Sequence, residues 1–207
     1  MPIQKGSASF SRFRVEHDGK AKVSKKDLPA AIGKSLAAHA FEPLDRKSED
    51  ERASGFVELA DKNGTRFAAG DTFTGPFAVF AIRVDEVRIP AAAIRAELET
   101  WEQGFVKENE RKPGKKEKND AKQEIRHTLK SRYPLASKLY EVNWNLENGH
   151  AQLWAGSRKA LDEVQDAVEQ AFSIKLVPIA PVTVAAEMGI AEKALAPTPS
   201  LSMLEEN

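Results

Sequence analysis

Ten lysine and arginine side chains lie between Lys107 and Arg132, against five aspartate and glutamate side chains. The 207-residue chain as a whole is neutral, with 31 basic and 31 acidic residues, so the remainder of the chain is acidic. Closely spaced cations can neutralise nucleic-acid phosphates, and each such contact releases counterions from the backbone. About six to ten contacts supply a large affinity that does not depend on base sequence. This cationic stretch is therefore the first candidate for function.

Part of the stretch has the pattern of an amphipathic helix with a cationic face. Asn119 or Asp120 can cap a helix that runs to about Ser131, and Pro134 stops it. Apolar and basic residues each recur every fourth position, so they form two parallel stripes on that helix, roughly 100° apart. The stripe expected to be buried is Ala121, Ile125 and Leu129, and the presented cations are Lys122, Arg126 and Lys130.

The residues before this helix are expected to form a basic loop. Pro113-Gly114 breaks any preceding helix, and the run from Arg111 to Lys118 holds five cations and one carboxylate. Few aromatic side chains lie nearby, which disfavours stacking on single-stranded bases and favours backbone contact without base readout, with duplex DNA as the partner. The predicted DNA contacts are Arg111, Lys112, Lys115, Lys116, Lys118, Lys122, Arg126, Lys130 and Arg132.

The same composition is also typical of a solvated helical hairpin that binds nothing. In that interpretation Glu108, Glu110, Glu117 and Glu124 pair with cations one helical turn away. Composition alone slightly favours the solvated hairpin, because mixed-charge hairpins are common. Another alternative is a protein-interaction adaptor with no nucleic-acid role, in which the acidic remainder and the C-terminal tail bind a partner protein.

Patterns for catalysis and metal binding are missing from the sequence. The chain has no cysteine, which excludes disulfides, thiolate catalysis and cysteine-ligated zinc. Its four histidines are scattered, and neither a nucleophile elbow nor a phosphate-binding glycine-rich loop is present. No run approaches the length of a membrane span, and the N-terminus lacks the apolar region of a secretory signal. We therefore expect a non-enzymatic, cytosolic protein with no catalytic residue, no metal and no cofactor.

Hydrophobic alternation and turn residues predict strands on both sides of the cationic stretch. Asn148-Gly149 is a strong hairpin signal between two of them. The expected strands are 10–15, 56–59, 77–87, 139–146, 151–155 and 174–179.

Three further helices are predicted besides the cationic one. They begin at a capping box at Ser24, at Pro90 in the first helical position, and at a cap at Ser157. A weak helix is possible between Val182 and Leu195. The fold class is α+β, with a β-α-β-β-α unit and an α-β-β-α-β unit joined by a basic helical connector. The expected domains are 1–106, 107–181 with the connector, and a flexible tail at 182–207.

The connector and the hairpin after it resemble the recombination-associated protein RdgC family. The resemblance rests on Lys115-Lys116-Glu117-Lys118, Glu124 to Leu129, the Asn148-Gly149 turn, Ser157 to Ala160 and Val177-Pro178, and it covers about Phe10 to Ile179. Two features depart from the family. Lys130-Ser131-Arg132-Tyr133-Pro134 stands where the family has Leu-Pro-Arg-Ala-Phe, and the family continues for roughly another hundred residues.

The resemblance implies a cytoplasmic, nucleoid-associated protein that binds DNA with little sequence preference. Family members form a ring-shaped dimer with a basic inner surface and restrain recombinase activity. The resemblance therefore implies a homodimer that modulates DNA recombination or recombinase access, and a recombination protein as a possible partner. Because the portion that helps to close the ring is missing here, an open dimer or another assembly is expected.

Overall fold

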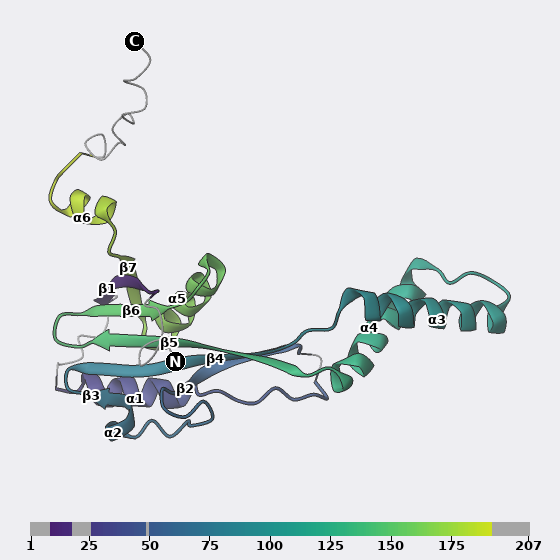
Figure 1. The fold of residues 1–207 in the computed structure, drawn as a ribbon, viewed down its shortest axis with the longest axis horizontal. Coiled ribbons are helices and arrows are strands. Elements are labelled where there is room, and N and C mark those ends of the chain that lie inside the picture. The colour runs from purple at the N-terminus through teal and green to yellow at the C-terminus, as the bar shows by residue number, and fades with distance from the viewer. Residues whose placement is uncertain (1–8, 18–25, 49, 192–207) are drawn as a thin grey trace, which may run out of the picture. The chain divides into compact units, whose positions relative to one another are not determined.

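A computed structural model describes residues 9–17, 26–48 and 50–191 of the chain. Its described residues form seven strands, paired antiparallel, and six helices (Figure 1). The predicted α+β class is confirmed. The capping residue expected at Ser24 and most of the C-terminal tail lie outside the described residues.

The chain divides into two compact units, each assembled from separate stretches of sequence. Unit 1 consists of Met1–Ile32, Phe73–Val79 and Glu141–Asn207, and unit 2 consists of Gly33–Thr72 and Phe80–Tyr140. Helix α1 (Leu28–Ala38) and the long strands β4 (Phe77–Val87) and β5 (Leu135–Asn145) pass from one unit into the other. Residue 106, the expected domain boundary, lies inside a helix of unit 2. Independent folding of 1–106 and 107–181 stays a prediction.

The sheet of unit 1 is built on strands β1 (Ser11–His17), β6 (His150–Trp154) and β7 (Ile174–Pro178). β6 pairs with the end of β5 and with β1, and β1 pairs with β7. The hairpin predicted between β5 and β6 is present, and Gly149 adopts a φ of 69° there, which favours glycine. The short strand β3 (Phe73–Thr74), which no sequence pattern indicated, pairs with the start of β4.

The core of unit 1 lies under helix α5 (Arg158–Phe172). Ser157 caps this helix as predicted, because its side chain accepts the Ala160 N–H at 3.3 Å. Val164 and Val168 of α5 are buried. Alternate residues of the strands supply the other apolar side chains of the core, among them Phe13, Val142, Trp144, Leu153 and Leu176.

The two tryptophans of the β5–β6 hairpin lie on opposite faces of it. Trp144 is buried with its ring 5.6 Å from Phe172 of α5, edge to face. Trp154 is half-buried, and its ring centroid is 4.8 Å from that of Phe10. Trp144 is thus a core residue of unit 1.

The helices that precede and follow β7 in the sequence cover its outer edge. Leu176 donates its backbone N–H to Glu169 at 2.8 Å, and its carbonyl accepts a hydrogen bond from Gln165 at 3.2 Å. The carbonyl of Pro178 accepts the hydroxyl of Thr183, which belongs to helix α6 (Pro181–Glu187). Proline has no N–H of its own. Side chains from α5 and α6 therefore hold the outward polar groups of this edge.

In unit 2, strand β2 (Arg52–Glu58) pairs antiparallel with β4. It starts four residues earlier than predicted, because pairing along β4 extends it over residues 52–55. Its other edge bonds to the chain after α1, where Phe41 donates its N–H to the carbonyl of Phe56 at 2.8 Å. A side chain at Gly55 would place its Cβ only 2.4 Å from the Phe41 Cα, so this approach requires glycine. The short helix α2 (Ala69–Thr72) was not predicted.

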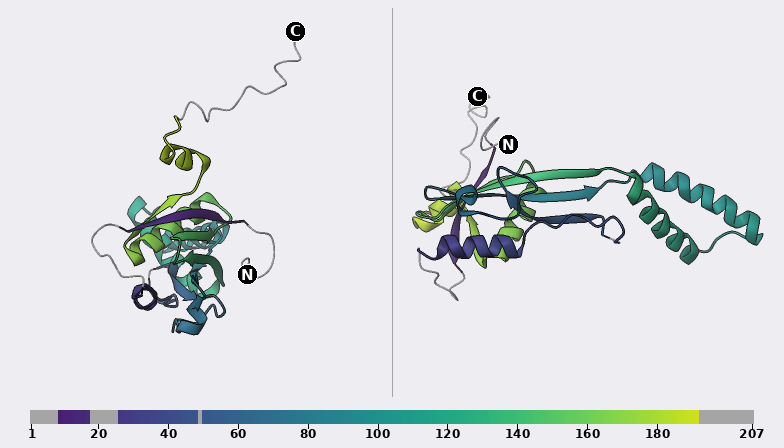
Figure 2. Two further views of the ribbon diagram at one scale, coloured as in Figure 1. Left: turned by 90° about the vertical axis from the view of Figure 1, so that its left-hand side faces the viewer. Right: turned by 90° about the horizontal axis from the view of Figure 1, so that it is seen from below.

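A helical hairpin joins β4 to β5 within unit 2 (Figure 2). Helix α3 (Ala91–Asn109) follows β4, and helix α4 (Lys115–Arg132) leads into β5. Pro90 is the N-cap of α3 rather than its first helical residue. The turn between the helices contains Glu110 in the left-handed conformation and then Pro113-Gly114, as the sequence indicated.

Candidate nucleic-acid interface

The cationic helix α4 begins at Lys115, four residues earlier than predicted. A carboxylate stabilises this start, because Glu117 accepts the Gly114 N–H at 2.6 Å and a hydrogen bond from Arg111, also at 2.6 Å. The bond from Arg111, followed by that from Gly114, lowers the pKa of Glu117 to about 2, so the cap is charged at neutral pH. The lysines expected in a loop are therefore helical: Lys115, Lys116 and Lys118.

The three cations of the predicted stripe have different surroundings. Lys122 is exposed, as expected. Arg126 is partly exposed, and its Nε lies 3.0 Å from Glu51 Oε1. Lys130 is 2% exposed, which contradicts its predicted presentation to DNA. Its Nζ donates to the carbonyl oxygens of Ser48 at 2.8 Å and Asp45 at 3.0 Å.

Lys130 is buried because the segment 45–48 folds over the last turn of α4. Arg46 of this segment donates to the carbonyls of Lys130, Ser131 and Tyr133, at 2.9–3.3 Å. These are carbonyls at the helix C-terminus, where a cation also interacts favourably with the helix dipole. The imidazole of His127 lies 3.1 Å from the Lys47 carbonyl. The segment and α4 are thus joined by reciprocal bonds from one lysine and one arginine.

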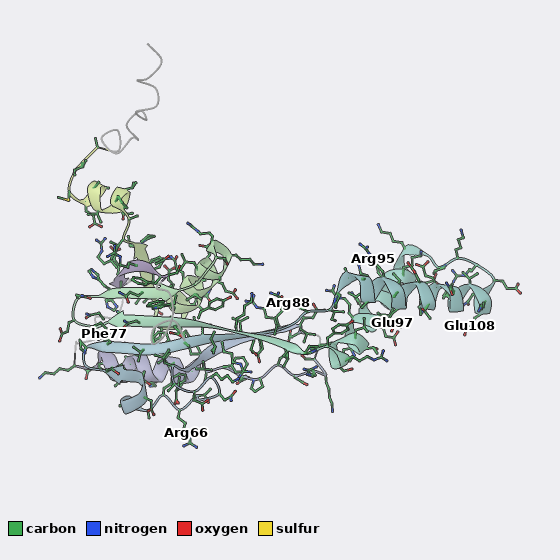
Figure 3. The ribbon with its side chains drawn as sticks, viewed as in Figure 1. Arg66, Phe77, Arg88, Arg95, Glu97 and Glu108 are labelled. Atoms are coloured by element: carbon green, nitrogen blue, oxygen red, sulfur yellow. The ribbon has the colours of Figure 1, made fainter. Side chains whose placement is uncertain are left out.

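Ion pairs engage three further predicted contacts. Arg111 pairs with Glu117 at 2.6 Å, Lys118 with Glu102 at 2.7 Å, and Arg132 with Glu97 at 3.7 Å. The last two pairs link α4 to α3 instead of following the i,i+4 spacing that a solvated hairpin was expected to use. Figure 3 labels Glu97 on α3, together with Arg95 and Glu108 of the same helix.

Four predicted contacts are exposed and form no ion pair with any described residue. Two lie in the first turn of α4, one precedes that helix and one lies two turns further along it. Lys107 at the end of α3 is also exposed and unpaired within the described part of the chain, although the predicted set did not include it. The four exposed contacts are Lys112, Lys115, Lys116 and Lys122.

Between α3 and α4 the apolar packing is incomplete. Ile94, Ala121 and Leu129 are buried, but Ile125 of the predicted stripe is only half-buried. Trp101 is also half-exposed, and it lines an open groove of about 420 Å³ together with Ile125. The hairpin therefore presents a part of its apolar seam to solvent.

A match to a known protein family extends over parts of both units, including the α3–α4 hairpin. A family model described as "Putative exonuclease, RdgC" matches residues 13–191. The chain belongs to the RdgC family. The resemblance seen in the sequence is thereby confirmed, and membership supports a recombination-related role. No curated protein matches the chain.

Other kinds of site are missing from the described residues of this RdgC-family chain. Within them, no group of three or more histidine, aspartate or glutamate side chains is arranged to hold a metal ion. None of their helices has both the length and the apolar composition needed to cross a membrane.

A buried ion pair in unit 2 was not anticipated from the sequence. Arg83 and Asp85 of β4 form two hydrogen bonds, at 2.7 and 2.9 Å. Burial raises the pKa of Asp85, but bonds from Arg83 and Ser137 outweigh it and leave that pKa below its ordinary value. Arg83 also lies over the ring of Phe41, 4.4 Å from its centroid. Arg83 and Asp85 are two residues apart, and residues with this spacing lie on the same face of a strand. This spacing is the sequence signal that could have identified the pair.

Proposed function

We propose that this RdgC-family protein binds the DNA backbone with little dependence on sequence and so modulates recombination or recombinase access. The observation that carries the proposal is the group of exposed lysines on the α3–α4 hairpin that form no ion pair with any residue in the described part of the chain. A lysine that is already paired must give up its partner before it can bind a phosphate, whereas an unpaired lysine does not. The group therefore neutralises phosphate at a lower cost than the other predicted contacts.

The start of α4 adds to the attraction of these lysines for an anion. The N-terminus of a helix carries a partial positive charge, because its first N–H groups have no partner within the helix. Lys115 and Lys116 lie in this first turn, with Lys112 just before it. The ammonium group of a lysine is a compact charge whose N–H donors can rotate. The side chains of all three lysines are exposed. This arrangement suits backbone contact more than base readout.

The proposal assigns binding, and no DNA cleavage, to this chain. The exonuclease activity that the family's description names is said of the family and not of this chain. Two carboxylates close to the exposed lysines are held by cations, since Glu102 pairs with Lys118 and Glu117 with Arg111. A nuclease needs such groups to bind metal or activate water. We expect duplex DNA incubated with the protein and Mg²⁺ to stay intact, and release of nucleotides would contradict this part of the proposal.

We further propose a cytoplasmic, nucleoid-associated homodimer. The exposed groove beside Trp101 and Ile125 supports self-association, because an apolar surface of this kind gains by burial. A mass measurement in solution, with and without DNA, tests the dimer. A monomer under both conditions would contradict it and leave backbone binding to be judged separately.

Binding itself is tested by a salt series with duplex DNA. Each phosphate contact contributes about −0.9 to the slope of log affinity against log salt concentration. Contacts from four lysines therefore give a slope of about −3.6. A slope near zero, or no binding, would contradict the proposal and favour the alternative of a protein-interaction adaptor.

A matched pair of triple variants locates the interface. Replacing lysines of the hairpin with glutamine should flatten the slope by roughly three. A control variant loses three exposed lysines elsewhere and should bind like the unmodified protein. Equal effects of the two variants would show that net charge, not this surface, determines binding. The hairpin variant changes Lys115, Lys116 and Lys122, and the control changes Lys34, Lys138 and Lys159.

A further inference from the structure

Arg126 of helix α4 is held by a carboxylate through two parallel hydrogen bonds. Its Nε lies 3.0 Å from Glu51 Oε1, and its Nη2 donates to Glu51 Oε2 at 3.2 Å. An arginine binds a phosphate group through the same fork of two N–H donors. The carboxylate of Glu51 therefore occupies the place that a phosphate would take on Arg126.

Both side chains of this pair are open to solvent, with 46% of Arg126 and 38% of Glu51 exposed. An exposed ion pair contributes little to stability, because water solvates both charges when they separate. The carboxylate of Glu51 bonds to no other residue in the described part of the chain. Its backbone carbonyl accepts the Val87 N–H at 2.9 Å, and this bond does not depend on where the side chain lies. A phosphate can thus displace the carboxylate while the backbone stays in place.

Two other cations of the predicted set are held by bonds that the helix itself needs. Arg111 is held by Glu117 in a similar fork, but Glu117 also accepts the Gly114 N–H and so caps α4. Lys130 is 2% exposed and donates to two backbone carbonyls near the end of that helix. Freeing either cation would disturb one end of α4. Of these three cations, Arg126 alone can exchange its partner at little cost.

The neighbour of Arg126 on the same helix face is an exposed lysine. Lys122 precedes Arg126 by four residues, which is about one helical turn, and it forms no ion pair with any described residue. A polyanion held at Lys122 brings its next phosphates to Arg126 at a high local concentration. It competes with Glu51 far better than a free anion does, because the second contact is intramolecular.

We propose that Glu51 is an internal competitor for DNA phosphate, which occupies Arg126 in the free protein and yields it to the backbone of bound DNA. The inference rests on the proposed DNA-binding function and adds an autoinhibitory contact to that site. Because the pair is exposed, the contact lowers the affinity for duplex DNA by about two- to fivefold. It also favours polyanions over single phosphate ions, since a single ion gains nothing from Lys122 when it displaces the carboxylate.

The test measures duplex binding by Glu51→Gln, with Glu16→Gln as the matched control. Each change raises the net charge by one, but in the control Arg14 stays paired with Glu187. Glu51→Gln should bind duplex DNA about two- to fivefold more tightly, and the control should bind like the unmodified protein. Neither glutamate is buried, so loss of folding does not enter the comparison.

Arg126→Gln separates competition from a general effect of charge. It should weaken binding and flatten the salt slope by about 0.9, the contribution of one phosphate contact. In the double variant the gain from Glu51→Gln should vanish, because no cation is left for it to free.

Three results would overturn Glu51 as a competitor: an unchanged affinity of Glu51→Gln, a gain equal to that of Glu16→Gln, or a gain that persists in the double variant. Duplex binding that still depends on the exposed lysines of α4 would then uphold the proposed function. An unmodified protein that does not bind duplex DNA would overturn both.

Discussion

Replacing Lys130 with methionine should destabilise the protein, although the change preserves most of the side chain's volume. The side chain is 2% exposed, and its ammonium donates to two carbonyls of the 45–48 segment, at 2.8 and 3.0 Å. Methionine fills the same space but donates nothing, so the Ser48 carbonyl loses this donor, whereas the Asp45 carbonyl keeps the hydrogen bond from the Ser48 hydroxyl at 2.8 Å. An acceptor left unsatisfied costs about 1–3 kcal/mol. Removal of a buried charge returns part of that cost, which leaves an expected loss of about 1–2 kcal/mol.

Urea unfolding followed by tryptophan fluorescence measures this loss. Lys122→Met is the matched control, because the same replacement occurs on the same helix at an exposed position, and its effect should stay within about 0.5 kcal/mol. The dependence of the unfolding free energy on urea concentration should be alike in both variants. If Lys130→Met unfolds at the same urea concentration as the control, the bonds to the 45–48 segment contribute nothing. The explanation given for the burial of Lys130 would then be wrong.

Three further predictions concern caps and close approaches. Because the pKa of Glu117 is lowered to about 2, its capping contribution to stability is present above the ordinary pKa of 4.5 and is lost as the pH falls from there towards 2. Circular dichroism of the unmodified protein and of Glu117→Gln as a function of pH tests this. Identical pH profiles of the two proteins would refute it. Ser157→Ala should cost about 1 kcal/mol in urea unfolding, since the α5 cap is lost, and an unchanged midpoint would contradict that role. Gly55→Ala should cost about 1–3 kcal/mol, because its Cβ would meet the backbone of Phe41, and a variant of full stability would show that the approach can relax.

Much of the fold follows from signals that are local in the sequence. Apolar side chains recur along strand β4, and β-branched and aromatic residues occur over its whole length. Its predicted bounds match the structure. Helix α5 has a hydroxyl cap, so its start was predicted from the sequence. The start of α4 was missed because Glu117 caps it from within the helix, whereas the prediction placed the cap on a side chain ahead of the helix, at Asn119 or Asp120.

The candidate site depended on contacts that no local pattern contains. Lys122 and Lys130 have equivalent places in the same stripe, yet one is exposed and the other buried. The difference in burial arises from the 45–48 segment, which bonds to Lys130 and lies more than 80 residues away from it in the chain. Similarly, the sequence shows that Arg126 is a cation but not that Glu51 is its partner. Pairing across such separations is a property of the fold, so the exposed lysines could be selected only from the structure.

The covered edge of β7 has a consequence for proteins that gather at high concentration. A strand with unsatisfied N–H and C=O groups at the margin of a sheet is a template on which another chain can add, and repeated addition produces fibrils. Between residues 176 and 178 the outward groups of β7 are already bonded to Glu169, Gln165 and Thr183, and Pro178 offers no donor. A second copy would have to break these bonds before it could extend the sheet here. Many copies of the chain can therefore lie close together without polymerising through this strand.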